Sequence, residues 1–379
     1  MKKTLLFAAL LLTVAAAAKA PVRETVTPAS DSRITWIART LVEGDNVSFD
    51  WSGSRCRIRF QGNYLAIKVS DTGKEFFNLW FDREPDYEAD KIITVTGQDT
   101  LIVLVNEADL AARYGKKVPA EHFVTLMKRN EGEQGITTVH AVVTRGALLQ
   151  ADPVKDRVIE FIGDSYTCGY GSENSIATDK FKPETENQNK SYNAIIGRYF
   201  DADILVIAHS GMGVARNYND KLKGYTMVER YLNVFDNGFD EVPDAPKWDP
   251  SMFPAKPDIT VIFLGANDFS VSRQPSKSQW KSRYAALLKE IKDFYGEDHP
   301  ILCCATHNDP EIFEYVKMAV DAANLKNVRY TCLCTGVQLE SERGADFHPN
   351  YAAHRKTAHV YIPYIATLTG WGLQDRPIQ

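Results

Sequence analysis

The pattern of hydrophobic and polar positions changes character near residue 150. Before this point, short segments rich in β-branched and aromatic residues alternate with Gly, Asn, Asp and Ser. Apolar and polar residues alternate in segments 56–60 and 65–69, as they do in strands with one buried face. The expected strands are 33–40, 47–51, 56–60, 64–69, 76–81, 91–95, 99–105, 122–128 and 135–143. Strands of this length and spacing predict an antiparallel all-β sandwich of jelly-roll type over residues 21–150.

After residue 153 the apolar residues form unbroken runs. Such runs are typical of a parallel sheet with helices on both faces, and they occupy 158–162, 204–208, 259–264, 301–305 and 328–333. Helical periodicity is clearest over 278–295 and 311–324. Residues 151–379 are therefore predicted to form an α/β/α three-layer domain with a mainly parallel sheet. Segment 218–257, which is rich in Tyr, Asp, Asn and Pro, is expected to be a long excursion over the surface of this domain.

The first twenty residues have the pattern of a secretory signal peptide. Lys2 and Lys3 precede an uncharged apolar run over 5–18, and Ala18-Lys19-Ala20 offers small residues for cleavage. An apolar run of this length is too short to span a bilayer comfortably. We therefore expect residues 1–20 to be removed and the mature protein to be secreted or periplasmic, with no membrane segment.

Composition narrows the class of partner. The 379 residues are 44% hydrophobic and 25% charged, which is the balance of a globular protein. The formal net charge of −5 provides no basic field for nucleic acid or an anionic membrane, so a neutral substrate fits better.

Cys303-Cys304 and the pair Cys332 and Cys334 lie in two runs expected to be neighbouring strands. One disulfide between these strands and buried free thiols are both possible interpretations. The oligomeric state does not follow from the sequence.

Four polar blocks follow predicted strands or strand-like runs and carry the residue types that acyl transfer needs. They are GDS at 163–165, HSGMG at 209–213, GAND at 265–268 and ADFHPN at 345–350. Together they supply a hydroxyl, a glycine N–H, a side-chain amide and an imidazole. The carboxyl ends of parallel strands share one edge of a sheet, so the four blocks could converge there. The GDS tripeptide alone also makes an ordinary turn, and only the combination indicates this chemistry.

These blocks resemble those of the SGNH (GDSL-like) hydrolases, which are centred on Ser, Gly, Asn and His. The segments RVIEFIGDSYTCGYG at 157–171, RNY at 216–218 and KRNE at 128–131 look like carbohydrate esterase family 2. That family joins a jelly roll to an SGNH domain, so the resemblance covers essentially the whole mature chain. It implies acetyl xylan esterase-like removal of O-acetyl groups from plant-wall polysaccharides or oligosaccharides, and it suggests position 6 of hexopyranosyl units.

By this resemblance, Ser165 is the nucleophile and His348 is the general base. The oxyanion hole would comprise the N–H groups of Ser165 and Gly211 with the side-chain amide of Asn267, and Gly213 is the alternative glycine. The chemistry would be attack of the serine on an acetyl carbonyl, transfer of the proton through the histidine, and release of acetate by water.

The third member of a catalytic triad is in question. SGNH enzymes commonly place an Asp three residues before the histidine, but Ala345 occupies that position here, and Asp346 lies two residues before His348. The side chain of Asp346 could still complete a weak triad. Alternatively, a backbone carbonyl could orient the imidazole of a Ser-His dyad, as in some members of family 2.

Several histidines and Trp248 can be interpreted either as structural or as functional residues. His209, next to the glycine block, is expected to be a buried, hydrogen-bonded residue rather than the base. His307, His354 and His359 have no ligand-spaced Cys or carboxylate partners, so neither a metal nor another cofactor is expected. Trp248 could be a stacking platform for a sugar ring or a local core anchor.

Two other functions remain as alternatives. An SGNH lipase or thioesterase should have an apolar mouth, whereas segment 216–249 is rich in Asn, Asp and Tyr. A catalytically weak carbohydrate-binding protein would rely on the jelly roll, but no residue of the four blocks is missing. The sequence therefore predicts a carboxylic ester hydrolase that acts on acetylated carbohydrate.

Overall fold

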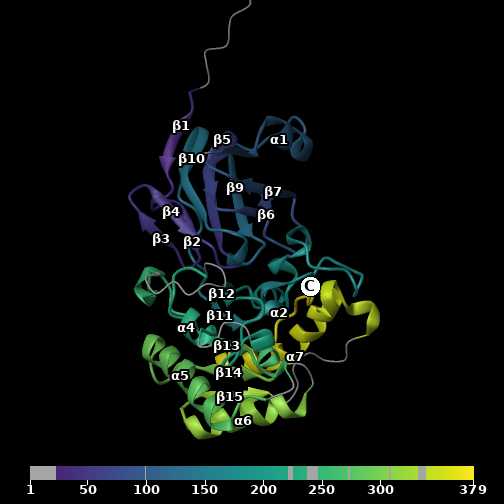
Figure 1. The fold of residues 1–379 in the computed structure, drawn as a ribbon. Helices are drawn as coiled ribbons and strands as arrows, with labels where there is room; N and C mark the ends of the chain where they lie inside the picture. Colours follow the sequence, from purple (N-terminus) through teal and green to yellow (C-terminus); the bar gives the residue numbers. More distant parts are fainter. Residues whose placement is uncertain are drawn as a thin grey trace, which may run out of the picture.

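The computed structural model describes residues 23–98, 100–220, 225–236, 246–271, 274–306, 309–331 and 339–379. They form two domains, an upper antiparallel sandwich and a lower parallel sheet in the view of Figure 1. The predicted signal peptide, 1–20, lies outside these residues. Within the described ranges, none of the helices is both long enough and apolar enough to cross a membrane.

The N-terminal domain is the antiparallel β-sandwich that the alternating pattern predicts. Its strand order is β3-β4-β10-β5-β9-β6-β7, with β1 beside β10 and with β2 and β8 beside β5. The strands are β1 (Thr25–Pro28), β2 (Thr35–Ile37), β3 (Leu41–Glu43), β4 (Asn46–Phe49), β5 (Arg55–Asp71), β6 (Lys74–Phe81), β7 (Lys91–Thr96), β8 (Thr100–Val105), β9 (Glu121–Lys128) and β10 (Thr137–Leu149). Helix α1 (Glu107–Tyr114) lies at the end of this domain, with Leu110 buried.

Strand β5 is longer than the sequence pattern predicts. Separate strands were expected at 56–60 and 64–69, but β5 runs unbroken through both. Gly62 makes this possible because its φ is 115° and a Cβ there would lie 2.3 Å from the carbonyl oxygen of Arg145 on β10. The two long strands therefore stay paired, with a register shift between Thr144 and Gly146.

The C-terminal domain contains a five-stranded parallel sheet of order β12-β11-β13-β14-β15. The strands are β11 (Val158–Gly163), β12 (Asp203–Ala208), β13 (Ile259–Phe263), β14 (Ile301–Cys304) and β15 (Val328–Thr331). Each begins within a residue of a predicted apolar run. Almost every residue of the first four strands is fully buried, as expected for a sheet covered on both faces.

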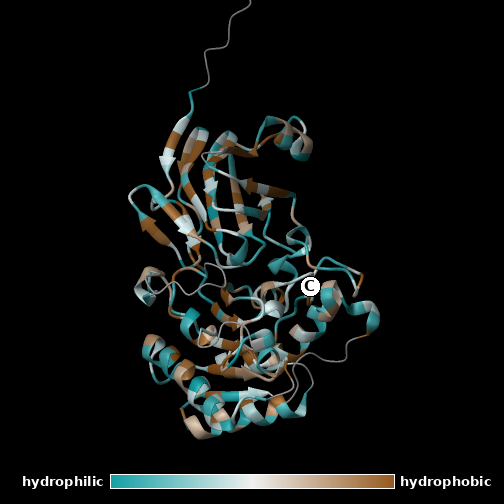
Figure 2. Ribbon diagram, viewed as in Figure 1, coloured by the Kyte–Doolittle hydropathy of each residue, from teal (hydrophilic) through white to brown (hydrophobic). Residues whose placement is uncertain are grey.

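Helices cover the two faces of this sheet, which confirms the predicted three-layer architecture. Helices α5 (Lys277–Tyr295) and α6 (Pro310–Ala323) pack on one face through Trp280 and Val316. Helices α3 (Tyr192–Phe200) and α7 (Tyr351–Thr369) pack on the other through Ile195 and Tyr361. Figure 2 shows the hydrophobic strands enclosed between these helices. The shorter helices are α2 (Ser165–Cys168), α4 (Met227–Arg230) and the 3-10 turns Gly132–Gln134, Pro183–Thr185, Gln188–Lys190, Tyr218–Asp220, Pro250–Met252, Ala266–Phe269, Glu340–Glu342 and Ala345–Phe347.

Segment 218–257 is only in part the surface excursion that we expected. Residues 226–236 are mostly buried and contact the sandwich, whereas most of residues 247–256 are exposed. The indole N–H of Trp51, in the sandwich, donates to the carbonyl oxygen of Val234 at 2.7 Å. The N–H of Asp236 donates to Oδ1 of Asp50 at 2.9 Å. The buried part of this segment therefore forms hydrogen bonds at an interdomain junction, while the part after residue 246 lies mostly at the surface.

The cysteines in the described residues include three buried free thiols, Cys56, Cys168 and Cys303. Cys332 and Cys334 lie outside the described residues. The alternative of a disulfide between the two strands therefore gains no support at Cys303, which is free.

Candidate active site

Ser165 stands where β11 ends and α2 begins. Asp164 caps this helix, since its Oδ1 accepts a hydrogen bond from the N–H of Tyr166 at 3.2 Å. Glycine is needed at position 163 because a Cβ there would lie 1.9 Å from Oγ1 of Thr167. The tight turn leaves the N–H of Ser165 at the first helical position, where no intrahelical acceptor exists.

His348 reaches Ser165 from a turn that precedes α7. Its Nε2 lies 2.9 Å from Oγ of Ser165, which is a distance for direct proton transfer. Its Nδ1 lies 3.2 Å from the backbone carbonyl oxygen of Asp346. A carbonyl can only accept a hydrogen bond, so this contact places the proton on Nδ1 and leaves Nε2 as the acceptor. A backbone group therefore favours the tautomer that a general base needs.

The carboxylate of Asp346 is directed away from the imidazole. It accepts hydrogen bonds from the hydroxyl of Tyr170 at 2.9 Å, from Nζ of Lys180 at 2.7 Å and from the N–H of Phe181 at 3.1 Å. Burial opposes the charge of this carboxylate, but these donors outweigh it and lower the pKa of Asp346. Of the two arrangements left open by the sequence, the geometry is that of a dyad oriented by a carbonyl.

The turn itself explains how the carbonyl is aimed. Asp346 has φ 48° and Phe347 has φ 63°, two successive non-glycine residues in the left-handed region. The turn is fixed by the three donors to the Asp346 carboxylate. In addition, the ring of Tyr170 lies 4.1 Å from the imidazole of His348, centroid to centroid, and 4.3 Å from the ring of Phe181. The stack and the carbonyl together restrict rotation of the histidine.

Gly211 is brought to the site and Gly213 is not. Gly211 lies in the loop after β12, lines the pocket beside Ser165, and its N–H has no acceptor among the described residues. The N–H of Gly213 instead donates to Oδ1 of Asn217 at 3.2 Å, and a Cβ at Gly213 would lie 2.3 Å from Oδ2 of Asp268. The structure therefore favours the first of the two candidate glycines.

Asn267 lies in the turn after β13 and also lines the pocket. Its Nδ2 donates to the carbonyl oxygen of Met212 at 2.9 Å and makes a longer contact of 3.4 Å with Oδ2 of Asp164. The longer contact holds the second N–H only weakly, so this N–H is the one available to an oxyanion. The carboxylate of Asp268, the next residue, accepts hydrogen bonds from the backbone N–H groups of residues 214, 215 and 216. It therefore holds the glycine loop in place and has no direct part in the reaction.

The pocket that contains Ser165 has a volume of about 1040 Å³ and is lined by both domains. The sandwich contributes Glu131, Glu133 and Gln134. Two exposed aromatic residues stand in its lining, Tyr218 with 57% and Phe347 with 51% of the residue surface accessible. The sequence did not place Glu133, Gln134 or Phe347 at the site, and it offered Glu131 only as the last residue of the family-like segment KRNE, because nothing local in the sequence shows which loop of one domain faces the other.

Trp248 is not brought to this pocket. It is 4% exposed and packs in a core cluster with Val158 and Leu205, and the guanidinium of Arg39 lies 4.8 Å from its ring centroid. A ring buried in this way offers no free face to a sugar. Of the two readings of Trp248, the structure agrees with the core anchor.

His209 is a buried, hydrogen-bonded residue. Its Nδ1 lies 2.6 Å from Oδ2 of Asp236, whose Oδ1 lies 2.8 Å from Nη1 of Arg230. Burial alone would lower the pKa of His209, but the carboxylates of Asp236 and Glu131 outweigh burial and raise it. The histidine therefore belongs to an ion network beneath the glycine loop.

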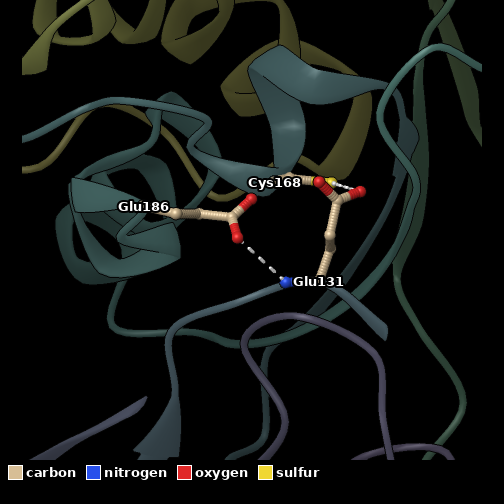
Figure 3. A group of neighbouring side chains, drawn as sticks. All are labelled: Glu131, Cys168 and Glu186. Carbon is tan, nitrogen blue, oxygen red and sulfur yellow. Dashed lines mark hydrogen bonds between the residues drawn. The ribbon is translucent and has the colours of Figure 1, made fainter. Parts of the chain in front are cut away.

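Figure 3 shows a second buried group near this network, made of Glu131, Cys168 and Glu186. The thiol of Cys168 donates to Oε2 of Glu131 at 3.6 Å, and the N–H of Glu131 donates to Oε2 of Glu186 at 3.3 Å. Burial raises the pKa of both Cys168 and Glu186 well above their ordinary values, which favours their protonated forms. Protonated groups are poor metal ligands, and the cluster fits a structural role better.

Two family profiles match the chain. The GDSL-like Lipase/Acylhydrolase family matches residues 161–356, which is more than half of the chain, and the Carbohydrate esterase 2 N-terminal family matches residues 39–153. The first covers most of the parallel sheet, together with Ser165 and His348. The second lies within the sandwich and the linker that follows it.

Curated proteins and solved structures agree with these matches. The chain is 29% identical over 332 residues to the cellulase/esterase CelE of Acetivibrio thermocellus, covering 85% of this chain and 38% of that protein. It is 26% identical over 300 residues to an acetylxylan esterase / glucomannan deacetylase of Cellvibrio japonicus, covering 74% of this chain and 76% of that protein. A family two carbohydrate esterase from Clostridium thermocellum, solved in complex with cellohexaose, superposes with a TM-score of 0.77 at 27% identity, covering 89% of this chain and 99% of that chain.

The family matches, the two-domain fold and the solved relative all confirm the resemblance seen in the sequence motifs. The chain therefore belongs to the GDSL-like Lipase/Acylhydrolase family and is a carbohydrate esterase of the family 2 type, with its β-sandwich joined to the hydrolase domain.

Proposed function

We propose that the protein is a serine esterase that removes O-acetyl groups from plant-wall polysaccharides or oligosaccharides. The observation that carries the proposal is the 2.9 Å contact between Nε2 of His348 and Oγ of Ser165, beside the N–H of Gly211. Neither a metal ion nor an organic cofactor is needed for this reaction. The catalytic groups are a hydroxyl, an imidazole and fixed N–H donors.

The reaction follows from the positions of these groups. Oγ of Ser165 attacks the acetyl carbonyl carbon while Nε2 of His348 takes the hydroxyl proton. The charge that develops on the carbonyl oxygen faces the N–H groups of Ser165 and Gly211 and the amide of Asn267. His348 then gives the proton to the departing sugar oxygen, which leaves as an alcohol. Water attacks the acetyl-enzyme, His348 takes its proton and returns it to Oγ, and acetate departs.

The pocket supports a carbohydrate substrate. It is wide and open, both domains line it, and the exposed rings of Tyr218 and Phe347 offer faces on which a sugar can stack. The relatives support the same class, since one is named acetylxylan esterase / glucomannan deacetylase and another was solved with cellohexaose. Release of acetate from acetylated xylan and acetylated glucomannan tests this directly, and NMR of the products shows whether position 6 is preferred.

A lipase or thioesterase of the same family is the alternative. A series of 4-nitrophenyl esters separates the two, because an acyl-chain enzyme gains binding energy with each added methylene. We expect acetate to be the best substrate of the series. A strong preference for octanoate over acetate would exclude the deacetylase.

We also propose that residues 1–20 direct export, so that the enzyme meets its polymeric substrate outside the cytoplasm. The pattern of Lys2, Lys3 and the apolar run supports this. N-terminal sequencing of the protein recovered from the medium or periplasm checks it, and a mature chain that begins at Met1 would contradict it.

A further inference from the structure

The loop that carries Gly211 is held by a residue of the other domain. Oε2 of Glu131, which follows β9 of the sandwich, accepts a hydrogen bond from the backbone N–H of Ser210 at 2.6 Å. Glu131 is 1% exposed, so water does not compete for this bond. Ser210 immediately precedes Gly211, the glycine proposed for the oxyanion hole.

Gly211 needs external support because its backbone has little conformational preference. Its φ is 79°, a value that glycine adopts freely and that no side chain enforces. Two hydrogen bonds flank it. The Ser210 N–H is bound to Glu131 on one side, and the Gly211 carbonyl oxygen accepts from the N–H of Tyr218 at 2.7 Å on the other. These two anchors hold the peptide planes on either side of the one that carries the Gly211 N–H, and they thereby restrict its orientation.

Glu131 is itself fixed in place. Nζ of Lys128 donates to the carbonyl oxygens of Asn130 and Glu131 at 2.8 and 3.1 Å. Oδ1 of Asn130 accepts from the N–H of Phe76 at 3.0 Å. The carbonyl oxygen of Arg129 accepts from the N–H of Gln188, in the hydrolase domain, at 3.1 Å. The segment 128–131 is thus bound to both domains, and it presents the Glu131 carboxylate at a defined position.

We propose that Glu131 is a positioning residue for the oxyanion hole, and hence that the β-sandwich completes the active site of the hydrolase domain. This inference rests on the proposed serine esterase function. Glu131 does not touch the reacting atoms. It acts through Ser210, by keeping the N–H of Gly211 directed at the oxygen that becomes negative in the transition state.

The test compares kcat and KM for 4-nitrophenyl acetate in Glu131→Ala, Glu131→Gln and a matched control. Loss of one oxyanion donor costs about 10²–10³-fold in kcat, which bounds the effect of misplacing it. We expect Glu131→Ala to lower kcat by about 30- to 300-fold, with KM within about threefold of wild type. Glu131→Gln keeps an acceptor oxygen at the same distance but loses the charge, so kcat should fall by only about three- to tenfold.

The control is Asp203→Asn. Asp203 is another buried carboxylate at the contact between the two domains, with its Oδ2 3.1 Å from Nη1 of Arg57, and it lies at the start of β12, at the opposite end of this strand from the glycine loop. We expect this variant to lose thermal stability but to keep kcat within about twofold, because the Ser210 anchor is intact. A merely structural role for Glu131 predicts instead that Glu131→Gln and Asp203→Asn both lose activity in proportion to their loss of folded protein.

Several outcomes would overturn the inference. One is a folded Glu131→Ala enzyme with kcat within threefold of wild type. Another is an equal loss of kcat in Asp203→Asn and Glu131→Gln. If Glu131→Ala does not fold, Glu131→Gln decides, and an unchanged kcat then counts against the inference. A wild-type enzyme that hydrolyses none of the esters would instead refute the proposed function, so the two failures are distinct.

Discussion

At the residue scale, Asp346 uses its main chain and its side chain for different tasks. Its carbonyl oxygen accepts from Nδ1 of His348, while its carboxylate binds Tyr170, Lys180 and Phe181 and stabilises the turn. The sequence shows that the usual acidic position holds Ala345, and it thereby raises the dyad as an alternative. It cannot show which oxygen of Asp346 meets the imidazole, because this depends on a left-handed turn that these residues do not signal.

Substitution of Asp346 therefore separates the dyad from the triad. In a triad, an Asp-to-Asn change can cost about 10⁴-fold because the wrong histidine tautomer is favoured. Here Asp346→Asn leaves the backbone carbonyl in place, and asparagine tolerates a positive φ. Its side-chain oxygen still accepts a hydrogen bond from the hydroxyl of Tyr170. We expect kcat to fall by no more than about tenfold, whereas His348→Ala should lose about 10⁴-fold or more. A comparable loss in both variants, measured on 4-nitrophenyl acetate, would restore Asp346 as a third catalytic member.

At the element scale, the strands of the parallel sheet and helices α5 and α6 follow directly from unbroken apolar runs and helical periodicity. Other elements do not. Strand β5 is continuous because Gly62 allows close backbone approach, a fact that appears only once β10 lies beside it. Helices α3 and α7 were not singled out, and α7 contains Pro363, which weakens a helical prediction. The sequence around Trp248 was equally compatible with a surface platform for a sugar ring, because the burial of this residue depends on contact between the domains.

The turn from β11 into α2 allows an element-scale prediction. Gly163→Ala places a Cβ within 1.9 Å of Oγ1 and 2.5 Å of Cβ of Thr167, so the start of α2 must shift. Overpacking of this kind costs about 1–3 kcal/mol of stability, and the shift displaces Ser165 relative to His348. We expect kcat to fall by about 10²-fold, since displacements near 1 Å have effects of that size. The control is Gly97→Ala, in an open turn of the sandwich, which should leave kcat unchanged. If Gly163→Ala retains full activity, the turn from β11 into α2 adapts to the added Cβ and the prediction is wrong.

At the scale of the whole molecule, the two domains share buried charges. Arg39 of the sandwich is 1% exposed, and its Nη2 lies 3.3 Å from Oε1 of Glu160 on β11. Its Nη1 donates to the carbonyl oxygen of Asn233 at 3.1 Å, and it stacks on Trp248. With the Glu131 bond to Ser210, these contacts make the sandwich part of the folded hydrolase rather than a tethered module.

The buried ion pair between Arg39 and Glu160 is expected to contribute strongly to the free energy of unfolding. Arg39→Ala leaves Glu160 buried without its cationic partner, which typically costs about 3–5 kcal/mol. Arg59→Ala removes an arginine whose side chain is 43% exposed and lies 3.3 Å from Glu121, and it should cost less than about 1 kcal/mol. Denaturant unfolding of both variants measures the difference. Equal free energies of unfolding would show that the junction contributes little to the stability of the protein.

The central claim is that Ser165 carries the acetyl group between sugar and water. The direct measurement is mass spectrometry of the enzyme quenched in acid during turnover of acetylated glucomannan. We predict one acetyl group on the peptide that contains Ser165, no acetylation there in Ser165→Ala, and loss of acetate release in that variant. Acetate release that persists in Ser165→Ala, or an acetyl group found on a different residue, would contradict the account.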